Sequence, residues 1–210
     1  MTFNNQMDNQ DLFSQKANFF DRWAPNYDWL LTTIFYQAIH QRLLSYVTLP
    51  HPSQVLDLGC GTGRLLHRLA NKFPDLQGTG VDLSPQMLKE ARQNNQHHPR
   101  LIYTKGNAES LPFVHNQFDA VFNTISFLHY PHPQIVFSEV SRILRPQGQF
   151  FLADFTMGTM KSTRFSPGGI NFYNTQQREK FAETVGLNCM GHYHLLPRVI
   201  LSIFSPTSST

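Results

Sequence analysis

The residues best suited to binding a small polar molecule lie between Val55 and Leu65, where the chain reads VLDLGCGTGRL. An apolar run that contains Asp57 is followed by three alternating glycines, and an apolar pattern of helical period then begins. Glycine lets a strand turn sharply into a helix and leaves the backbone accessible to a ligand. A second acid, Asp82, ends the next apolar run. Together these residues indicate one nucleoside-binding half of an α/β sheet.

The charges around the glycine turn distinguish between two kinds of nucleoside cofactor. Asp82 is expected to accept hydrogen bonds from both ribose hydroxyls, although an acid here could instead only cap the following helix. Asp57 lies where a dinucleotide would place its pyrophosphate, which a carboxylate repels, whereas the ammonium and sulfonium of S-adenosylmethionine favour a carboxylate. The glycines form Gly-x-Gly-x-Gly, not the Gly-x-Gly-x-x-Gly of phosphate sites. Both observations favour S-adenosylmethionine over NAD(P).

Alternating strands and helices must position these residues. Such alternation predicts a parallel sheet, which binds ligands at the carboxyl ends of its strands. The last two strands leave no room for a helix between them, so they should form an antiparallel hairpin. We expect an α/β fold with a Rossmann-like, doubly wound, seven-stranded sheet, mostly parallel, and helices on both faces. The expected strands are 54–58, 78–82, 101–105, 118–123, 149–154, 188–195 and 199–205, and the expected helices are 29–47, 63–72, one that begins at 85, 133–144 and 175–185.

Local signals set several of these boundaries. Ser84 stands before a proline, which predicts a helix start, and Asn174 with Gln177 resembles a capping box. Gly186 suits the end of that last helix. The residues Arg-Pro-Gln-Gly at 145–148 predict a turn ahead of the fifth strand.

Length and composition predict one domain with a substantial core. The chain has 210 residues, of which 40% are hydrophobic and 15% charged, which argues against global disorder. Residues 1–18 are expected to form a flexible tail, and 19–210 a single domain. Within it, 19–48 should form N-terminal helices and 155–173 a loop that contacts the substrate.

Charge and cysteine content exclude several classes of protein. The net charge of +3 is spread along the chain without a basic run, so neither a nucleic-acid substrate nor a polybasic membrane anchor is indicated. Cys60 and Cys189 are too few for a disulfide framework and lack the spacing of a metal site, so no metal is expected. We expect a cytoplasmic protein. No apolar run reaches the length of about 18 residues that a membrane span requires, and no signal sequence is expected.

Five motifs in a fixed order resemble those of the class I S-adenosylmethionine-dependent methyltransferases. The likeness is greatest to the small-molecule group that includes the ubiquinone and menaquinone C-methyltransferases, known as methyltransferase type 11. It covers about residues 19–205, and FDRWAPNYD at 20–28 is similar to that group's N-terminal signature. The five motifs are VLDLGCGTG at 55–63, GVDLSPQML at 80–88, GNAESLPF at 106–113, FDAV at 118–121 and LRPQG at 144–148.

The resemblance implies a role for each matching position. In that family the glycine turn and its acid hold the methionine end of the cofactor, and the acid after the second strand holds the ribose. Leu83, Asn107 and Ala108 would contact the adenine. Asn123 would lie beside the transferred methyl group, and Tyr27 would help to close the cofactor site. The implied cofactor-binding residues are Tyr27, Asp57, Gly59, Cys60, Gly61, Gly63, Asp82, Leu83, Met87, Asn107, Ala108 and Asn123.

The implied reaction is transfer of a methyl group from S-adenosylmethionine to a small metabolite by in-line displacement. The donor is already activated, so a protein base is needed only where the acceptor has a proton to lose, and His129 and Asp154 are the candidates. Apolar residues in the loop at 155–173 suit a hydrophobic or aromatic acceptor. An NAD(P)-dependent oxidoreductase and a non-catalytic S-adenosylmethionine-binding protein are the alternatives. The protein is expected to be a monomer or a homodimer.

Overall fold

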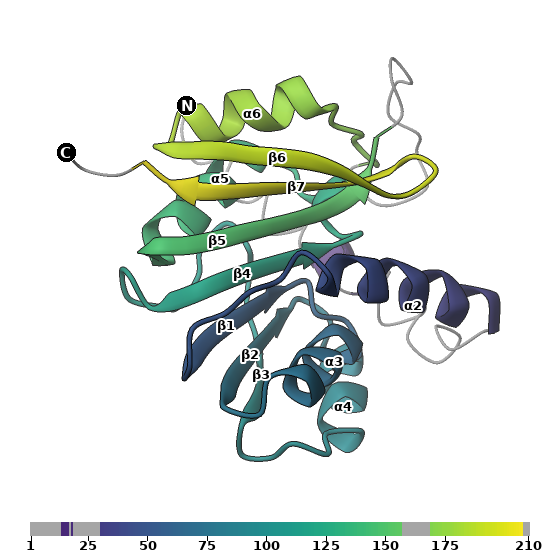
Figure 1. Cartoon of the computed structure of the whole chain (residues 1–210). Coiled ribbons are helices and arrows are strands. Elements are labelled where there is room, and N and C mark those ends of the chain that lie inside the picture. Colours follow the sequence, from purple (N-terminus) through teal and green to yellow (C-terminus); the bar gives the residue numbers. More distant parts are fainter. Residues whose placement is uncertain (1–13, 17, 19–29, 157–168, 208–210) are drawn as a thin grey trace, which may run out of the picture.

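A mixed sheet forms the centre of the computed structural model, which describes residues 14–16, 18, 30–156 and 169–207. Within these residues, seven strands follow the order β3-β2-β1-β4-β5-β7-β6 (Figure 1). Strands β1 to β5 run parallel, and β7 pairs antiparallel with β5 and β6. The expected Rossmann-like topology and the antiparallel C-terminal hairpin are therefore confirmed. The strands are β1 (Ser53–Leu58), β2 (Leu76–Asp82), β3 (Leu101–Lys105), β4 (Phe118–Thr124), β5 (Leu144–Phe155), β6 (Leu187–Leu196) and β7 (Val199–Pro206).

Helices cover both faces of the sheet because neighbouring strand residues point to opposite sides. On β4, Phe122 packs in a core cluster with residues of α2, α3 and α4, while Val121 packs in a second cluster with residues of α5 and α6. Figure 1 shows α6 along the β6–β7 edge and α3 and α4 beside β2 and β3. The helices are α2 (Leu30–Leu44), α3 (Arg64–Lys72), α4 (Pro85–Gln93), the 3₁₀ turn η2 (Phe127–His129), α5 (Pro133–Ile143) and α6 (Thr175–Glu183).

The local signals for helix starts are confirmed. The Ser84 hydroxyl accepts a hydrogen bond from the Met87 N–H at 3.1 Å, so Ser84 caps α4. Asn174 and Gln177 form a reciprocal capping box at the start of α6. Gly186, which follows that helix, has a φ of 73°, a backbone conformation that suits glycine.

The predicted turn at 145–148 is wrong, because β5 already begins at Leu144. Leu144 pairs with Phe118 of β4, and the register then shifts before Ala120 pairs with Gln149. The guanidinium of Arg145 donates to both carboxylate oxygens of Asp119, at 2.7 and 2.6 Å. A tertiary contact therefore holds this segment against β4, and the proline and glycine form an irregularity within the strand pairing.

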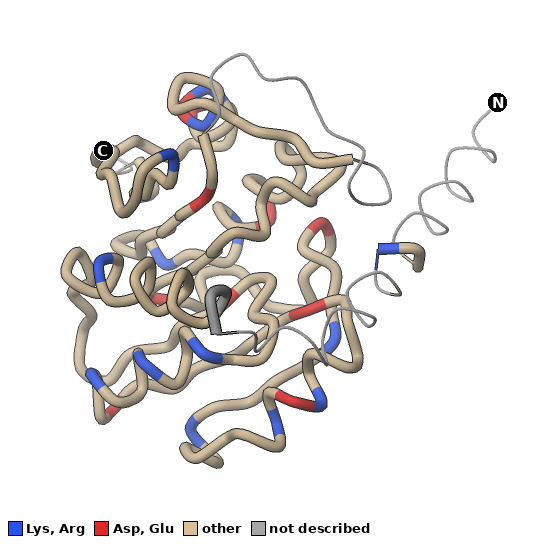
Figure 2. Tube along the Cα trace, turned by 90° about the vertical axis from the view of Figure 1, so that its right-hand side faces the viewer, with Lys and Arg blue, Asp and Glu red and all other residues tan. Residues whose placement is uncertain are grey.

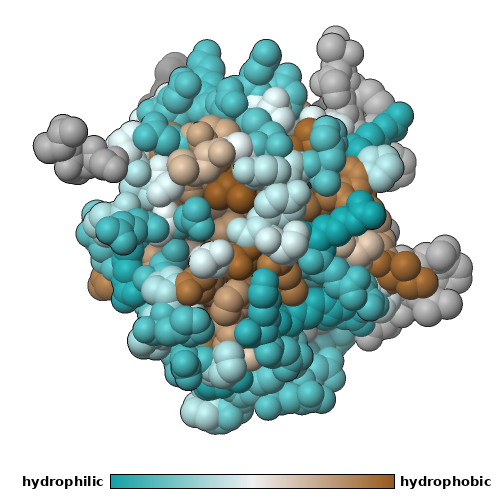
Figure 3. Space-filling model, in the orientation of Figure 1, coloured by the Kyte–Doolittle hydropathy of each residue, from teal (hydrophilic) through white to brown (hydrophobic). Residues whose placement is uncertain are grey.

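The surface of the described residues is of mixed polarity. Figure 3 shows hydrophilic side chains surrounding smaller apolar areas, and Figure 2 shows acidic and basic residues interspersed along the trace. No helix within the described ranges is both long enough and apolar enough to cross a bilayer. Most of the expected flexible tail, the N-terminal signature at 20–28 and most of the loop at 155–173 lie outside the described residues, whereas 14–16 and 18 within the tail are described and are helical. The large apolar side chains exposed on the described part are Ile34, Tyr46, Ile102, Val114, Ile135 and Met190.

Candidate active site

A pocket opens at the carboxyl ends of β1, β2 and β4, where the strand order reverses between β1 and β4. It encloses about 1000 Å³ of empty space, part of it open to solvent. Most of the cofactor-binding residues that the sequence predicted line this pocket. Those that line the pocket are Asp57, Gly59, Cys60, Gly61, Asp82, Leu83, Met87 and Ala108, together with His129.

Five predicted residues are not part of this lining as the structure describes it. Gly63 caps the start of α3, and Asn107 forms an isolated bridge with Ser110. Asn123 and Asp154 are buried near the pocket, and Tyr27 lies outside the described residues.

The glycine turn between β1 and α3 forms an open backbone shelf. Gly59 and Gly61 have positive φ angles of 73° and 52°. The N–H groups of Gly59 and Cys60 donate to the Val81 carbonyl at 2.8 and 3.0 Å, which ties the turn to β2. A Cβ at Gly59 would lie 2.4 Å from the Ser126 hydroxyl, whereas a Cβ at Gly61 would meet no atom within 4 Å. Gly61 therefore faces the empty space that a ligand could fill.

Asp82 holds the turn and the following helix through both carboxylate oxygens. Its Oδ2 accepts a hydrogen bond from the Gly61 N–H at 2.8 Å, and its Oδ1 accepts one from the Ser84 N–H at 2.9 Å. Each carboxylate oxygen can accept a further bond. Asp82 thus organises the shelf and also lines the pocket.

Asp57 is a buried acid without a full set of partners. It is 2% exposed and lines the pocket, and its Oδ1 has no hydrogen-bond partner among the described residues. Burial, and then the negative charge of Asp82, raise the pKa of Asp57 to about 8. Ionisation of Asp57 in the free protein is opposed by its burial and by repulsion from Asp82. A positively charged ligand would compensate both costs, so this site favours such a ligand.

Asn123 lies beneath the shelf and supports it. Its side-chain amide nitrogen lies 2.8 Å from the Leu58 carbonyl oxygen, 2.7 Å from the Ser126 hydroxyl and 3.0 Å from the Tyr130 hydroxyl, and its two protons are shared among these three acceptors. Ser126 and Tyr130 line the pocket, while Asn123 itself is fully buried. The amide therefore connects the end of β1 with the segment that follows β4.

His129 reaches the pocket from η2, and Asp154 holds that turn in place. The Leu128 N–H donates to Oδ2 of Asp154 at 3.0 Å, and the Phe155 N–H donates to its Oδ1 at 2.6 Å. Burial raises the pKa of Asp154 to about 6, against the lowering effect of Arg178. The structure thus places Asp154 as a support of η2, behind the pocket wall.

The environment of His129 favours a neutral imidazole. Burial, and then the positive charge of Lys16, lower the pKa of His129 to about 4. The Lys16 ammonium donates a hydrogen bond to the His129 carbonyl. Burial also lowers the pKa of Lys16 to about 8, despite the opposing charge of Glu109. A neutral imidazole at pH 7 can accept a proton, although at this pKa it is a weak base.

Helix α2 adds two pocket residues that the sequence reasoning missed. Tyr36 and His40 lie one turn apart on α2, with their ring centroids 6.0 Å apart, and both line the pocket. His40 is 4% exposed, and its Nδ1 has no partner in the part of the chain that the structure describes. Burial, and then the charge of Arg68, lower the pKa of His40 to about 3. Their spacing of four residues on one helix face was the available signal.

The fold and pocket define a class: a doubly wound α/β domain with an open glycine turn and two acids at its switch point, which is an arrangement typical of nucleoside-binding sites. Residues 55–148 match the family model described as "Methyltransferase domain". A malonyl-[acyl-carrier protein] O-methyltransferase of Hahella chejuensis is 33% identical over 149 residues, which cover 70% of this chain and 52% of that protein. An uncharacterized methyltransferase of Synechocystis sp. is 33% identical over 150 residues, with 66% and 68% covered.

Similarity in structure extends over most of the chain. In the complex between the Haloferax volcanii Trm112 methyltransferase activator and a methyltransferase, one chain matches with a TM-score of 0.82 and 19% identity, covering 90% of this chain and 97% of that one. At 19% identity, this match shows a similar fold and nothing about function. This chain belongs to the class I S-adenosylmethionine-dependent methyltransferases, a family whose methyl donor is S-adenosylmethionine. It spans about half the length of the first curated relatives it matches.

Proposed function

We propose that this chain transfers a methyl group from S-adenosylmethionine to a small, hydrophobic or aromatic metabolite by in-line displacement. The observation that carries the proposal is the buried Asp57 carboxylate. Its Oδ1 has no partner within the described part of the chain, and it lines the same pocket as the open backbone at Gly61. The ammonium and sulfonium of the cofactor would stabilise the ionised form of Asp57, whereas a pyrophosphate beside Asp57 and Asp82 would oppose its ionisation.

The other residues that line the pocket would bind different parts of the cofactor. Asp82 would accept hydrogen bonds from the ribose hydroxyls, because its carboxylate lines the pocket at the end of β2. Leu83, Met87 and Ala108 offer an apolar surface for the adenine. Neither Asn107 nor Asn123 lines the pocket. They would therefore support cofactor binding indirectly, by holding nearby backbone and side chains in place.

The acceptor side would be formed by α2 and the segment after β4. Tyr36, His40, Ile125, His129 and Pro131 line the pocket and are not required by the cofactor contacts above. Aromatic rings and a proline favour an acceptor of low polarity. These residues support a hydrophobic or aromatic substrate.

In the proposed reaction the protein mainly aligns the acceptor with the methyl group and excludes water, because a sulfonium is already an activated donor. Where the acceptor is a hydroxyl, His129 is the candidate proton acceptor. Asp154 would then be a positioning residue, since its two carboxylate oxygens hold the backbone of η2 and of the end of β5.

The test is transfer of labelled methyl from S-adenosylmethionine to a metabolite extract, with calorimetric binding of S-adenosylhomocysteine and NADH measured in parallel. We expect binding of S-adenosylhomocysteine and a labelled product of low polarity. Asp57→Asn should weaken that binding by about tenfold or more, since contacts with charged groups contribute roughly 1.5–3 kcal/mol. Asp75→Asn is the matched control, because Asp75 is an exposed acid outside the pocket.

Each alternative has its own outcome in this experiment. Binding of NADH without S-adenosylhomocysteine would identify an oxidoreductase and reject the proposal. Binding of S-adenosylhomocysteine with no labelled product across extracts would favour a non-catalytic binding protein.

A further inference from the structure

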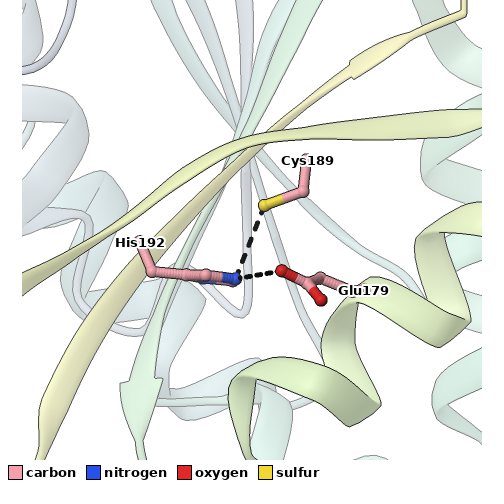
Figure 4. A group of neighbouring side chains, drawn as sticks. All are labelled: Glu179, Cys189 and His192. Carbon is pink, nitrogen blue, oxygen red and sulfur yellow. Dashed lines mark hydrogen bonds and ion pairs between the residues drawn. The ribbon is translucent and has the colours of Figure 1, made fainter.

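Three side chains with metal-binding atoms converge between α6 and β6. Figure 4 shows Glu179 reaching from the helix toward Cys189 and His192 on the strand. The Sγ of Cys189 lies 3.5 Å from Nε2 of His192, and the Oε1 of Glu179 lies 2.9 Å from the same nitrogen. The three ligand atoms all lie within 4.8 Å of one another. None of these residues lines the pocket, so this cluster is separate from the proposed methyl-transfer site.

The spacing of these atoms is close to that of a tetrahedral zinc site. Typical Zn–S and Zn–N bonds of about 2.3 and 2.0 Å place the sulfur and nitrogen about 3.5 Å apart at a tetrahedral angle. The Sγ to Nε2 distance of 3.5 Å already matches this value. The Nε2 to Oε1 distance of 2.9 Å would have to open by about 0.5 Å to reach the zinc-bound spacing. The side chain of Glu179 is 41% exposed, which gives it room for that movement and leaves solvent access for an ion.

The second nitrogen of the imidazole is already anchored. Nδ1 of His192 lies 2.9 Å from the hydroxyl of Ser202, a fully buried residue on β7. That hydroxyl also accepts a hydrogen bond from the Arg178 guanidinium at 3.2 Å. Metal-binding histidines commonly donate their other N–H to such a partner, which fixes the ring and aims Nε2 at the ion. Ser202 therefore holds His192 in an orientation suited to coordination.

We propose that Glu179, Cys189 and His192 bind one zinc ion, with water as the fourth ligand. The thiolate, the imidazole and the carboxylate form a donor set typical of zinc, and one open position is compatible with three protein ligands. The ion would join α6 to the β6–β7 hairpin, because its ligands come from both elements. The proposal does not depend on the methyl-transfer function.

The decisive experiment is substitution with cobalt(II). The 210-residue chain is treated with a chelator, dialysed and titrated with cobalt(II) chloride. We expect a thiolate-to-cobalt charge-transfer band that saturates at one ion per chain and is displaced by zinc chloride. Cys189→Ser should abolish the band. Cys60→Ser should retain it, because Cys60 is buried in the glycine turn, away from the cluster.

Two further pairs of variants keep the proposal testable if Cys189→Ser does not fold. His192→Ala should weaken zinc binding at least tenfold, while His194→Ala, which changes an exposed histidine two residues further along the strand and outside the cluster, should not. Glu179→Gln should also weaken it, and Glu183→Gln, one turn along α6 and exposed, should not. Zinc should raise the Tm of the wild-type protein, and chelator should reverse that rise.

Two outcomes would overturn the proposal. One is the absence of a charge-transfer band in the wild-type protein. The other is a band or zinc affinity that is unchanged in Cys189→Ser, His192→Ala and Glu179→Gln. Either result would leave the cluster as an ordinary ion pair between His192 and Glu179.

Discussion

At the residue scale, Asp57 links cofactor binding to pH. Its pKa is raised from 3.8 to about 8 in the free protein by burial and then by Asp82. For an acid with a raised pKa, the folded state loses stability as pH increases from about 4 to about 8. A bound sulfonium and ammonium would favour the charged form and lower that pKa again. Binding of S-adenosylmethionine at pH 7 should therefore release a proton, and its affinity should increase as pH approaches 8.

Calorimetry in buffers with different ionisation enthalpies measures this proton release. We expect nearly one proton per cofactor at pH 7 in the wild-type protein and almost none in Asp57→Asn. Equal release by both proteins would show that another group is responsible.

The two glycines of the turn provide a second residue-scale prediction. Gly61→Ala places a methyl group in the empty pocket, where no atom lies within 4 Å, at a positive φ of 52°. It should reduce the affinity for S-adenosylhomocysteine strongly and lower the unfolding free energy by only about 1–2 kcal/mol. Gly59→Ala should instead lower the Tm much more, because its methyl group would lie 2.4 Å from the Ser126 hydroxyl. Binding isotherms and thermal melts of both variants check this contrast, and a reversed order would contradict the assigned geometry.

Residues that are local in sequence could be predicted, whereas those brought in by packing could not. Asp57, Gly61 and Asp82 are encoded by strand ends and a short turn, so their grouping follows from the chain itself. His40 lies on α2, and its place in the pocket depends on how that helix packs. The resemblance implies that Asn123 lies beside the transferred methyl group. The contacts of its amide with the Leu58 carbonyl and with two hydroxyls depend on tertiary structure and could not be predicted.

At the scale of elements, α6 is fixed to the sheet by one buried guanidinium. Arg178 is 1% exposed and donates to the carbonyls of Asp154, Phe155 and Ile200 and to the Ser202 hydroxyl, across β5 and β7. Arg178→Met keeps the apolar stem but leaves these buried acceptors without their donor. We expect a loss of roughly 3–5 kcal/mol in the free energy of unfolding, measured with urea.

The matched control is Lys180→Met, which changes an exposed cation two residues further along the same helix. It should alter the free energy of unfolding by less than about 0.5 kcal/mol. If the two variants were equally stable, Arg178 would not be the link between α6 and the sheet.

Element boundaries were predictable where a single residue determines them. Ser84 and Asn174 cap α4 and α6 through their own side chains, so their types and positions were sufficient. The turn predicted at 145–148 failed because Leu144 pairs with Phe118 and Arg145 binds Asp119, two contacts with a distant strand. The proposed zinc site also depends on a contact between distant parts of the chain. Glu179 lies on α6, whereas Cys189 and His192 lie on β6, so their approach could not be predicted from the sequence.

At the scale of the whole molecule, the sheet and its glycine turn should make cofactor binding and folding stability interdependent. The pocket draws residues from α2, β1, β2, α4 and the segment after β4, which lie on both sides of the switch point. A ligand that fills it contacts only the folded chain. At a hundredfold excess over Kd, such a ligand should add about 2.7 kcal/mol to the free energy of unfolding.

For a domain of this size, that gain corresponds to an increase in Tm of roughly 5–10 °C. Differential scanning calorimetry with S-adenosylhomocysteine, and with NADH at the same concentration, measures it. We expect the increase with S-adenosylhomocysteine alone. Asp57→Asn should lose about half of the increase or more, as a tenfold or greater loss of affinity requires. The exposed-site control Asp75→Asn should keep the increase, because only the buried carboxylate lines the pocket. A shift of equal size with NADH would mean that the acids at the switch point do not discriminate between the two cofactors. The electrostatic argument for S-adenosylmethionine would then be wrong.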